Sequence, residues 1–230
     1  MIEKAMILAA GYGTRLKPFT DSMPKPLFPF KDGTILSYQI ERLKSSGVKE
    51  IVINAHHFYN KIIDYFQAND FGIKINIIVE KDILGTGGGI LNAKKYLESE
   101  ESFLVINVDV FTDFNVNLID EAFTKVKALA MLAIQKRKTS RYLEFDYDLN
   151  LIKRVKTDKP ENNHFAFNGI HVISSEIFKK ERLTGYKDII DLYIELTERG
   201  DTIKGFNSGS CYFIDLGKIE NIKIAEESSY

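Results

Sequence analysis

A glycine-rich, cationic stretch near the start of the chain has the residue types needed to bind phosphate. Residues 8–27 read LAAGYGTRLKPFTDSMPKPL and come directly after an apolar run. Glycines at the end of a strand let backbone N–H groups approach an anion closely. The predicted nucleotide-binding residues of this stretch are Ala10, Gly11, Gly13 and Thr14.

Two cations in the same stretch add charge to those backbone donors. Arg15 follows the glycines, and Lys25 lies between Pro24 and Pro26. Proline fixes φ on both sides of the lysine, which lowers the entropy cost of presenting its charge. Arginine binds phosphate oxygens as a fork and lysine as a point charge, so the pair could cradle a polyphosphate.

Two better-known phosphate motifs do not fit this stretch. A P-loop requires Gly-Lys followed by Ser or Thr, and that sequence is missing at the required spacing. A dinucleotide fingerprint requires a third glycine, but Leu16 stands there and Pro18 follows where a helix should continue. An ordinary glycine-rich turn would explain the glycines alone, but not the arrangement of the cations.

Two aspartates at the ends of apolar segments are candidate metal ligands. Asp109 ends the segment FLVINVDV, and Asp215 ends the segment CYFID. Aspartates at strand ends are often caps or turn formers, and either one alone could be explained so. Two carboxylates in a chain with a phosphate-type loop suit the oxygen coordination that Mg²⁺ prefers.

Strands and helices alternate in the first half of the chain and would bring these residues to one edge of a sheet. The apolar runs are continuous rather than alternating, which indicates strands covered on both faces. Helical spacing of apolar residues separates them, so we expect a doubly wound, largely parallel α/β sheet with ligands beyond its carboxyl ends. The predicted strands are 5–10, 50–55, 74–80, 103–110 and 128–134, and the predicted helices are 34–47, 59–70 and 88–99.

The second half of the chain has a different pattern. Residues 142–158 predict a hairpin, and residues 165–173 another strand. An amphipathic helix over 185–200 and a final buried strand over 211–217 complete the prediction. Because no linker or repeat interrupts the chain, we expect a single domain over 1–230. The change of pattern distinguishes two halves, about 1–110 and about 111–230.

Composition argues against several classes of partner. The 230 residues carry a formal net charge of -1, so nothing suggests a nucleic-acid or polybasic membrane contact. No apolar stretch approaches membrane-spanning length, and the single Cys211, expected to be a small buried residue, fits a reducing compartment. His56 and His57 point to opposite faces if extended, so we expect pocket lining or surface rather than a metal site. We expect a cytoplasmic protein.

The motifs together resemble the sugar-1-phosphate nucleotidylyltransferases. GYGTRLKPFTDSMPKPL resembles the family signature G-x-G-T-R-x-x-P-x-T followed by P-K-P, and the similarity extends along nearly the whole chain. Among small single-domain bacterial members, it is most similar to N-acetylmuramic acid-1-phosphate uridylyltransferases and mannose- or heptose-1-phosphate guanylyltransferases. The other matching segments are LGTGGGI (84–90), NVDVFTD (107–113), DKP (158–160), FNGIHV (167–172) and YFIDLG (212–217).

The resemblance implies a fold, a reaction and a set of residue roles. The fold is Rossmann-like and GT-A-like, with a mixed, mostly parallel sheet, and the resemblance makes about 1–110 the nucleotide-binding half and about 111–230 the sugar-binding half. The reaction joins an NTP and a sugar 1-phosphate into an NDP-sugar and pyrophosphate with Mg²⁺, in a monomer or small homo-oligomer. The implied roles are catalysis by Arg15, Lys25 and Asp109; metal binding by Asp109 and Asp215; base contact by Gly85 and Thr86; and sugar-phosphate contact by Asp158, Lys159, Asn168 and Gly169.

Three departures from the family pattern leave alternatives open. Val108 stands where the family usually has glycine, Lys218 where it has threonine, and Asp158 where it has glutamate. A glycosyltransferase of the same fold, which consumes a nucleotide-sugar, is one alternative, although it needs no cations for a triphosphate tail. A degenerate nucleotide-binding sensor without turnover is the other.

Overall fold

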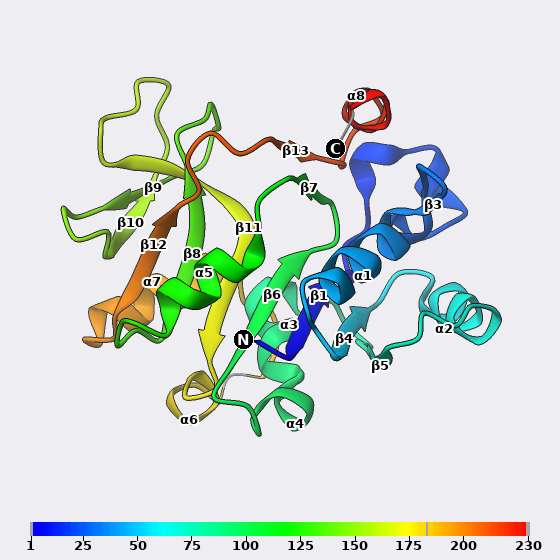
Figure 1. Cartoon of the computed structure of the whole chain (residues 1–230), viewed down its shortest axis with the longest axis horizontal. Coiled ribbons are helices and arrows are strands. Elements are labelled where there is room, and N and C mark those ends of the chain that lie inside the picture. Colours follow the sequence, from blue (N-terminus) through cyan, green and yellow to red (C-terminus); the bar gives the residue numbers. More distant parts are fainter. Residues whose placement is uncertain (1, 183, 229–230) are drawn as a thin grey trace.

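A computed structural model describes residues 2–182 and 184–228, and among these residues nine strands form one central sheet (Figure 1). Four strands of the first half are parallel and neighbours in the order β6–β1–β4–β5. Their carboxyl ends therefore meet at one edge, where ligands bind in sheets of this kind. Their bounds are β1 Lys4–Leu8, β4 Glu50–Ala55, β5 Lys74–Val79 and β6 Ser102–Asn107.

The second half of the chain extends the sheet in mixed orientation. The long strand β11 (His164–Ser174) runs antiparallel to β6, β8 and β9. The hairpin predicted over 142–158 is confirmed, because β9 and β10 pair antiparallel. The bounds are β8 Ala130–Gln135, β9 Tyr142–Phe145, β10 Leu151–Val155 and β12 Ile203–Asn207, which pairs parallel with β8.

Helices cover both faces of the sheet, as continuous apolar strands require. Successive residues of β1 point to opposite sides, so Ile7 and Met6 lie in two separate apolar clusters. The first cluster includes side chains of α1 and α5, which Figure 1 shows in front of the sheet, and the second includes α3, which lies behind it. The doubly covered α/β fold expected from the sequence is confirmed.

Local sequence explains where the helices begin. Thr34 accepts a hydrogen bond from the Ser37 backbone N–H at 3.0 Å and caps α1 (Ile35–Ser45), which buries its apolar face. Asp188 does the same for α7 (Ile189–Glu198), so this helix begins later than the predicted 185. The other helices are α2 Tyr59–Ala68, α3 Gly85–Asn92, α4 Lys94–Leu97, α5 Val116–Phe123, α6 Ile177–Lys180 and α8 Ile219–Glu227. No helix of the described ranges is long and apolar enough to cross a membrane.

Three predicted features are wrong in detail. The glycines at 85–89 do not precede a helix but form the first turns of α3, and the helix predicted over 88–99 is divided between α3 and α4. The final strand is the short, half-buried β13 (Phe213–Asp215), which pairs with β7 (Val110–Thr112) outside the central sheet. Cys211 is also half-buried rather than buried.

Short elements shape the cationic stretch after β1. Three 3-10 turns cover Thr14–Leu16, Phe19–Asp21 and Lys25–Leu27. A small hairpin of β2 (Pro29–Phe30) and β3 (Gly33–Thr34) then leads into α1. The stretch therefore folds back as a loop over the carboxyl end of β1, where a regular helix would have carried its cations away.

Candidate active site

Two cavities meet at the carboxyl edge of the parallel strands. The first, of about 360 Å³, lies between the 8–27 loop and α3, and we call it the nucleotide cavity. The second, of about 330 Å³, is lined by β9, β10, β11, β13, the start of α7 and the segment after β8. We call it the acceptor cavity because it contains Asn168 and Gly169, which the sequence predicts to contact the sugar phosphate. Four residues line both cavities: Thr86, Asn107, Asp109 and Asp188.

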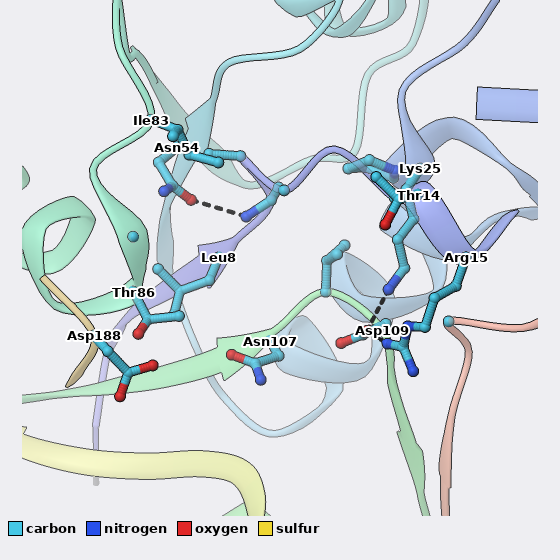
Figure 2. Close-up of a pocket in the computed structure, with 18 of the residues that line it drawn as sticks. Leu8, Thr14, Arg15, Lys25, Asn54, Ile83, Thr86, Asn107, Asp109 and Asp188 are labelled. Carbon is cyan, nitrogen blue, oxygen red and sulfur yellow. Dashed lines mark hydrogen bonds and ion pairs between the residues drawn. The ribbon is translucent and has the colours of Figure 1, made fainter. Parts of the chain in front are cut away.

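The nucleotide cavity brings together the predicted residues of both glycine-rich segments. Figure 2 shows Lys25 and Arg15 directed from the loop toward Asp109, while Thr86 approaches from α3. Two segments about 75 residues apart in sequence thus form opposite walls of one cavity. The predicted residues in its lining are Ala10, Gly11, Gly13, Thr14, Arg15, Lys25, Gly85, Thr86 and Asp109.

Lys25 is held in place before any substrate binds. It is 9% exposed and forms an ion pair with Asp109. Gly13 has φ +64°, and a side chain there would put its Cβ 2.8 Å from the Lys25 Cβ. The prediction that Gly13 frees backbone for an anion is therefore incomplete, because this glycine also makes room for the lysine.

Arg15 lies between the two aspartates predicted to bind metal. Its Nη2 is 3.2 Å from both carboxylate oxygens of Asp215 and 4.0 Å from Oδ2 of Asp109. Both carboxylates thus reach a single guanidinium group from two neighbouring elements, the β6–β7 turn and β13. Arg15 therefore supplies positive charge between the two carboxylates that the sequence predicts to bind metal.

The donors present fit a magnesium ion. Within residues 2–182 and 184–228, no group of three or more histidine, cysteine or acidic side chains is arranged around one point. Mg²⁺ is commonly held by one or two carboxylates together with waters and substrate phosphates, so Asp109 and Asp215 are a sufficient protein contribution. Their oxygens are hard ligands of the kind this ion prefers.

A buried polar network, which the sequence prediction missed, connects the two walls of the nucleotide cavity. Asn54 accepts a hydrogen bond from the Ala9 N–H at 2.8 Å and donates to Glu80 at 2.6 Å. Glu80 also accepts from the Leu84 N–H at 3.0 Å. A lone asparagine inside an apolar strand gave only a weak signal, yet it fixes the start of the phosphate loop relative to α3.

The glycines of α3 allow close contact with the segment before α7. The N–H groups of Gly87 and Gly88 both donate to the Lys187 carbonyl, at 2.8 and 3.2 Å. The hydroxyl of Thr86 accepts from the Ile189 N–H at 2.8 Å. Thr86, predicted to contact the base, therefore already has a structural partner at the junction of the cavities.

The acceptor cavity contains only part of the predicted sugar-phosphate set. Asn168 and Gly169 line it, whereas Asp158 and Lys159 lie on an exposed loop and line neither cavity. Three arginines that the sequence prediction missed line this cavity: Arg137, Arg141 and Arg154. Burial lowers the pKa of Arg137, and the nearby charge of Asp215 partly opposes that shift.

The histidine pair lies outside both cavity linings. The ring of His56 is 2.9 Å from the Glu80 carbonyl and 3.3 Å from the Tyr12 hydroxyl. The rings of His56 and His57 both contact the edge of Tyr12, at 5.5 and 5.6 Å between centroids. The two imidazoles are half-buried and hold an aromatic residue of the phosphate loop.

A phosphate-type loop follows the first strand of a doubly covered sheet and faces carboxylates at strand ends. This arrangement is typical of nucleotide-binding α/β proteins. The family model "Nucleotidyl transferase" matches residues 4–228, and the chain belongs to that family. It is therefore an enzyme that transfers nucleotidyl groups, and the family and fold expected from the sequence are confirmed.

Relatives and solved structures agree with this assignment. The chain is 30% identical over 223 residues to the D-glycero-alpha-D-manno-heptose 1-phosphate guanylyltransferase of Campylobacter jejuni, covering 95% of this chain and 96% of that protein. It is 30% identical to mannose-1-phosphate guanyltransferase 2 of Candida glabrata, covering 93% of this chain but 59% of the relative. The crystal structure of HddC from Yersinia pseudotuberculosis superposes with a TM-score of 0.82 at 26% identity, covering 98% and 99% of the two chains. That protein has also been solved with GMP-PN.

Proposed function

We propose that this enzyme is a Mg²⁺-dependent guanylyltransferase that joins GTP and a manno-configured sugar 1-phosphate into a GDP-sugar and pyrophosphate. The two relatives described above support guanine and a manno-type sugar, because both names specify a guanylyl or guanyl donor and a mannose or manno-heptose acceptor. The observation that carries the proposal is the meeting of two cavities at Asp109. Two substrates bound there would have their phosphates side by side.

The nucleotide cavity supplies the charge that a triphosphate needs. Lys25, held beside Asp109, would bind the α-phosphate region. Arg15, half-exposed at the mouth of the loop, would exchange Asp215 for the leaving pyrophosphate. Each preorganised donor of this kind typically contributes about 3 kcal/mol or more to the transition state.

The attacking group needs no general base. A phosphate monoester has a second pKa of about 6, so the acceptor oxygen is mostly ionised at neutral pH. The protein must instead align two mutually repelling anions and compensate their charge. Asp109 and Asp215 would hold Mg²⁺, which when bound neutralises phosphate charge.

A pyrophosphate-release screen tests this proposal. GTP, ATP, CTP, UTP and dTTP are combined with α-D-mannose 1-phosphate, α-D-glucose 1-phosphate, N-acetylglucosamine 1-phosphate and inositol 1-phosphate, with and without MgCl₂. We expect release with GTP and mannose 1-phosphate, abolished by EDTA. Turnover confined to another base or sugar contradicts the specificity. Release of free NDP from a nucleotide-sugar favours a glycosyltransferase, and nucleotide binding without turnover favours a sensor.

A further inference from the structure

Arg137 is a preorganised guanidinium group in the wall of the acceptor cavity. It follows the carboxyl end of β8, and its Nε donates to Oδ1 of Asn168 at 3.1 Å. Its Nη2 donates to the Phe167 carbonyl at 2.9 Å, and its guanidinium carbon lies 4.1 Å from the ring centroid of Phe213. Two hydrogen bonds and an aromatic face therefore fix its orientation.

Part of this guanidinium remains available for a ligand. The group carries five N–H donors, and its Nη1 makes no hydrogen bond within the described part of the chain. Phe213 and Asp215 are two residues apart on β13 and so point to the same side of that strand. The guanidinium of Arg137, which packs on Phe213, therefore lies on the side of β13 that carries Asp215, and the charge of Asp215 acts on it.

The side chain of Asn168 uses its hydrogen bonds to orient Arg137. Its Oδ1 accepts from the arginine, and its Nδ2 donates to the Ser208 hydroxyl at 3.1 Å. The Ser208 hydroxyl in turn donates to the Ile134 carbonyl at 3.0 Å, which fixes the direction of the chain of hydrogen bonds. Because Asn168 is only 3% exposed, it has little surface left for the sugar contact predicted from the family.

The other two arginines of the acceptor cavity are either paired with carboxylates or not held in one orientation. Arg154 pairs with Asp188 at 2.6 Å and Asp191 at 3.3 Å. Arg141 is exposed, and among the described residues nothing bonds its guanidinium. A fixed guanidinium loses less entropy on binding an anion than a free one, which favours Arg137.

We propose that Arg137 binds the phosphate of the acceptor, the role that the family pattern gives to Lys159, and that Asn168 is its positioning residue. This rests on the proposed function, since the acceptor is taken to be a sugar 1-phosphate. The guanidinium fork would hold two oxygens of that phosphate while Asp215 lies alongside. Lys159 would remain on its exposed loop.

Steady-state kinetics of four variants test this assignment, with the acceptor varied at saturating nucleotide. We expect Arg137→Ala to raise the KM for the sugar 1-phosphate by about 10- to 100-fold, the range expected for losing a hydrogen bond to a charged group. The KM for the nucleotide should stay within about twofold. Arg137→Lys should recover part of the loss, because it restores charge without the fork. The matched control is Lys138→Ala, which removes one charge from the adjacent, exposed position.

Two outcomes overturn the assignment: an unchanged acceptor KM in Arg137→Ala, or an equal rise in Lys138→Ala, which would indicate a diffuse field. Asn168→Ala should raise the acceptor KM with little change in kcat, as a positioning role predicts.

If the unmodified enzyme turns over no pair in the screen, the proposed function fails. Inorganic phosphate then serves as the probe: comparing Lys25→Ala with Lys25→Ala/Arg137→Ala by calorimetry, about tenfold weaker binding supports Arg137, and equal binding overturns it.

Discussion

The nucleotide cavity and the acceptor cavity share one wall but are built in different ways. In the first, a single continuous stretch, residues 8–27, supplies the glycine backbone and both cations. In the second, Arg137 follows the end of β8, Arg154 lies on β10 and Asp215 ends β13, so the three residues come from segments far apart in the sequence. The conformation of one loop positions the cations of the first cavity, whereas the pairing of distant strands positions the charged residues of the second.

This difference affects what a substitution does. In the nucleotide cavity, side chains pair directly with one another, so removing one leaves an opposite charge uncompensated. In the acceptor cavity, Arg137 is oriented by neutral partners and an aromatic ring. We therefore expect the largest effects on turnover from the first cavity and graded effects on acceptor affinity from the second.

The largest expected effect is the loss of Lys25 or of its partner. Lys25→Ala or Asp109→Asn should reduce pyrophosphate release by about a hundredfold or more, because each removes a preorganised charge from the reaction centre. Lys17→Ala serves as the control, since Lys17 is an exposed lysine of the same loop that lines neither cavity. Circular dichroism should show an intact fold, and near-normal turnover in either site variant would refute the mechanism.

Arg15→Ala should have a smaller effect on turnover and an opposite effect on metal binding. Turnover should fall by about 10- to 100-fold, because the leaving pyrophosphate loses one charged partner. Without nucleotide, Mn²⁺ used as a probe should bind more tightly to the variant, because Asp215 no longer pairs with a guanidinium. Electron paramagnetic resonance titration measures this binding, and weaker binding would contradict the placement of the metal.

Acidic pH should lower the free energy of unfolding of the chain through His171. This histidine is buried beside the Tyr193 hydroxyl at 2.7 Å, and burial lowers its pKa from 6.5 to about 3. The unfolded chain therefore binds a proton that the folded chain does not, so this contribution to stability is complete above pH 6.5 and lost as the pH falls toward 3. Between pH 7.5 and 5 the loss is about 2 kcal/mol.

Urea unfolding at the two pH values measures the effect of His171. The variant His171→Asn is neutral at both, so it should show a smaller loss of unfolding free energy than the unmodified chain. Equal losses would mean that other groups govern acid sensitivity.

The smallest expected effect concerns Thr86, where the cavities meet. Thr86→Val keeps the shape but removes the acceptor of the Ile189 N–H, so the unfolding free energy should fall by about 1 kcal/mol. Urea denaturation measures this change. If stability is unchanged while the choice of base relaxes, Thr86 acts on the nucleotide and not on α7.

Contiguous chemistry was accessible from the sequence. Candidate site residues could be predicted where they lie close together in the sequence. Examples are the Pro24-Lys25-Pro26 triplet, the glycines before it and the aspartate that follows an apolar strand. The alternation of strands and helices likewise predicted the doubly covered sheet. The edge at which such sheets bind ligands is the one where the two cavities lie. The roles of the individual site residues stay predictions until the variants are measured.

The missed features depend on contacts between distant segments. In the sequence, Arg137 lies in the run QKRKTSRY, which looks like an ordinary solvated charged loop. Its partners Asn168 and Phe213 are 31 and 76 positions away, and only the pairing of β8 with β11 and the course of β13 bring them near. The close contact of the α3 glycines was missed for the same reason, because the Lys187 carbonyl that accepts from Gly87 and Gly88 lies about 100 residues later.

The paired charges of Lys25 with Asp109 and Arg15 with Asp215 have a consequence for how this site can change over time. Each acidic side chain has a cationic neighbour when no substrate is present. A single replacement therefore leaves a charge stranded in the resting protein as well as in the reacting one. Selection for a folded chain and selection for an active enzyme act on the same four side chains, so these four would persist or disappear together. Arg137, whose partners are neutral, could be replaced independently.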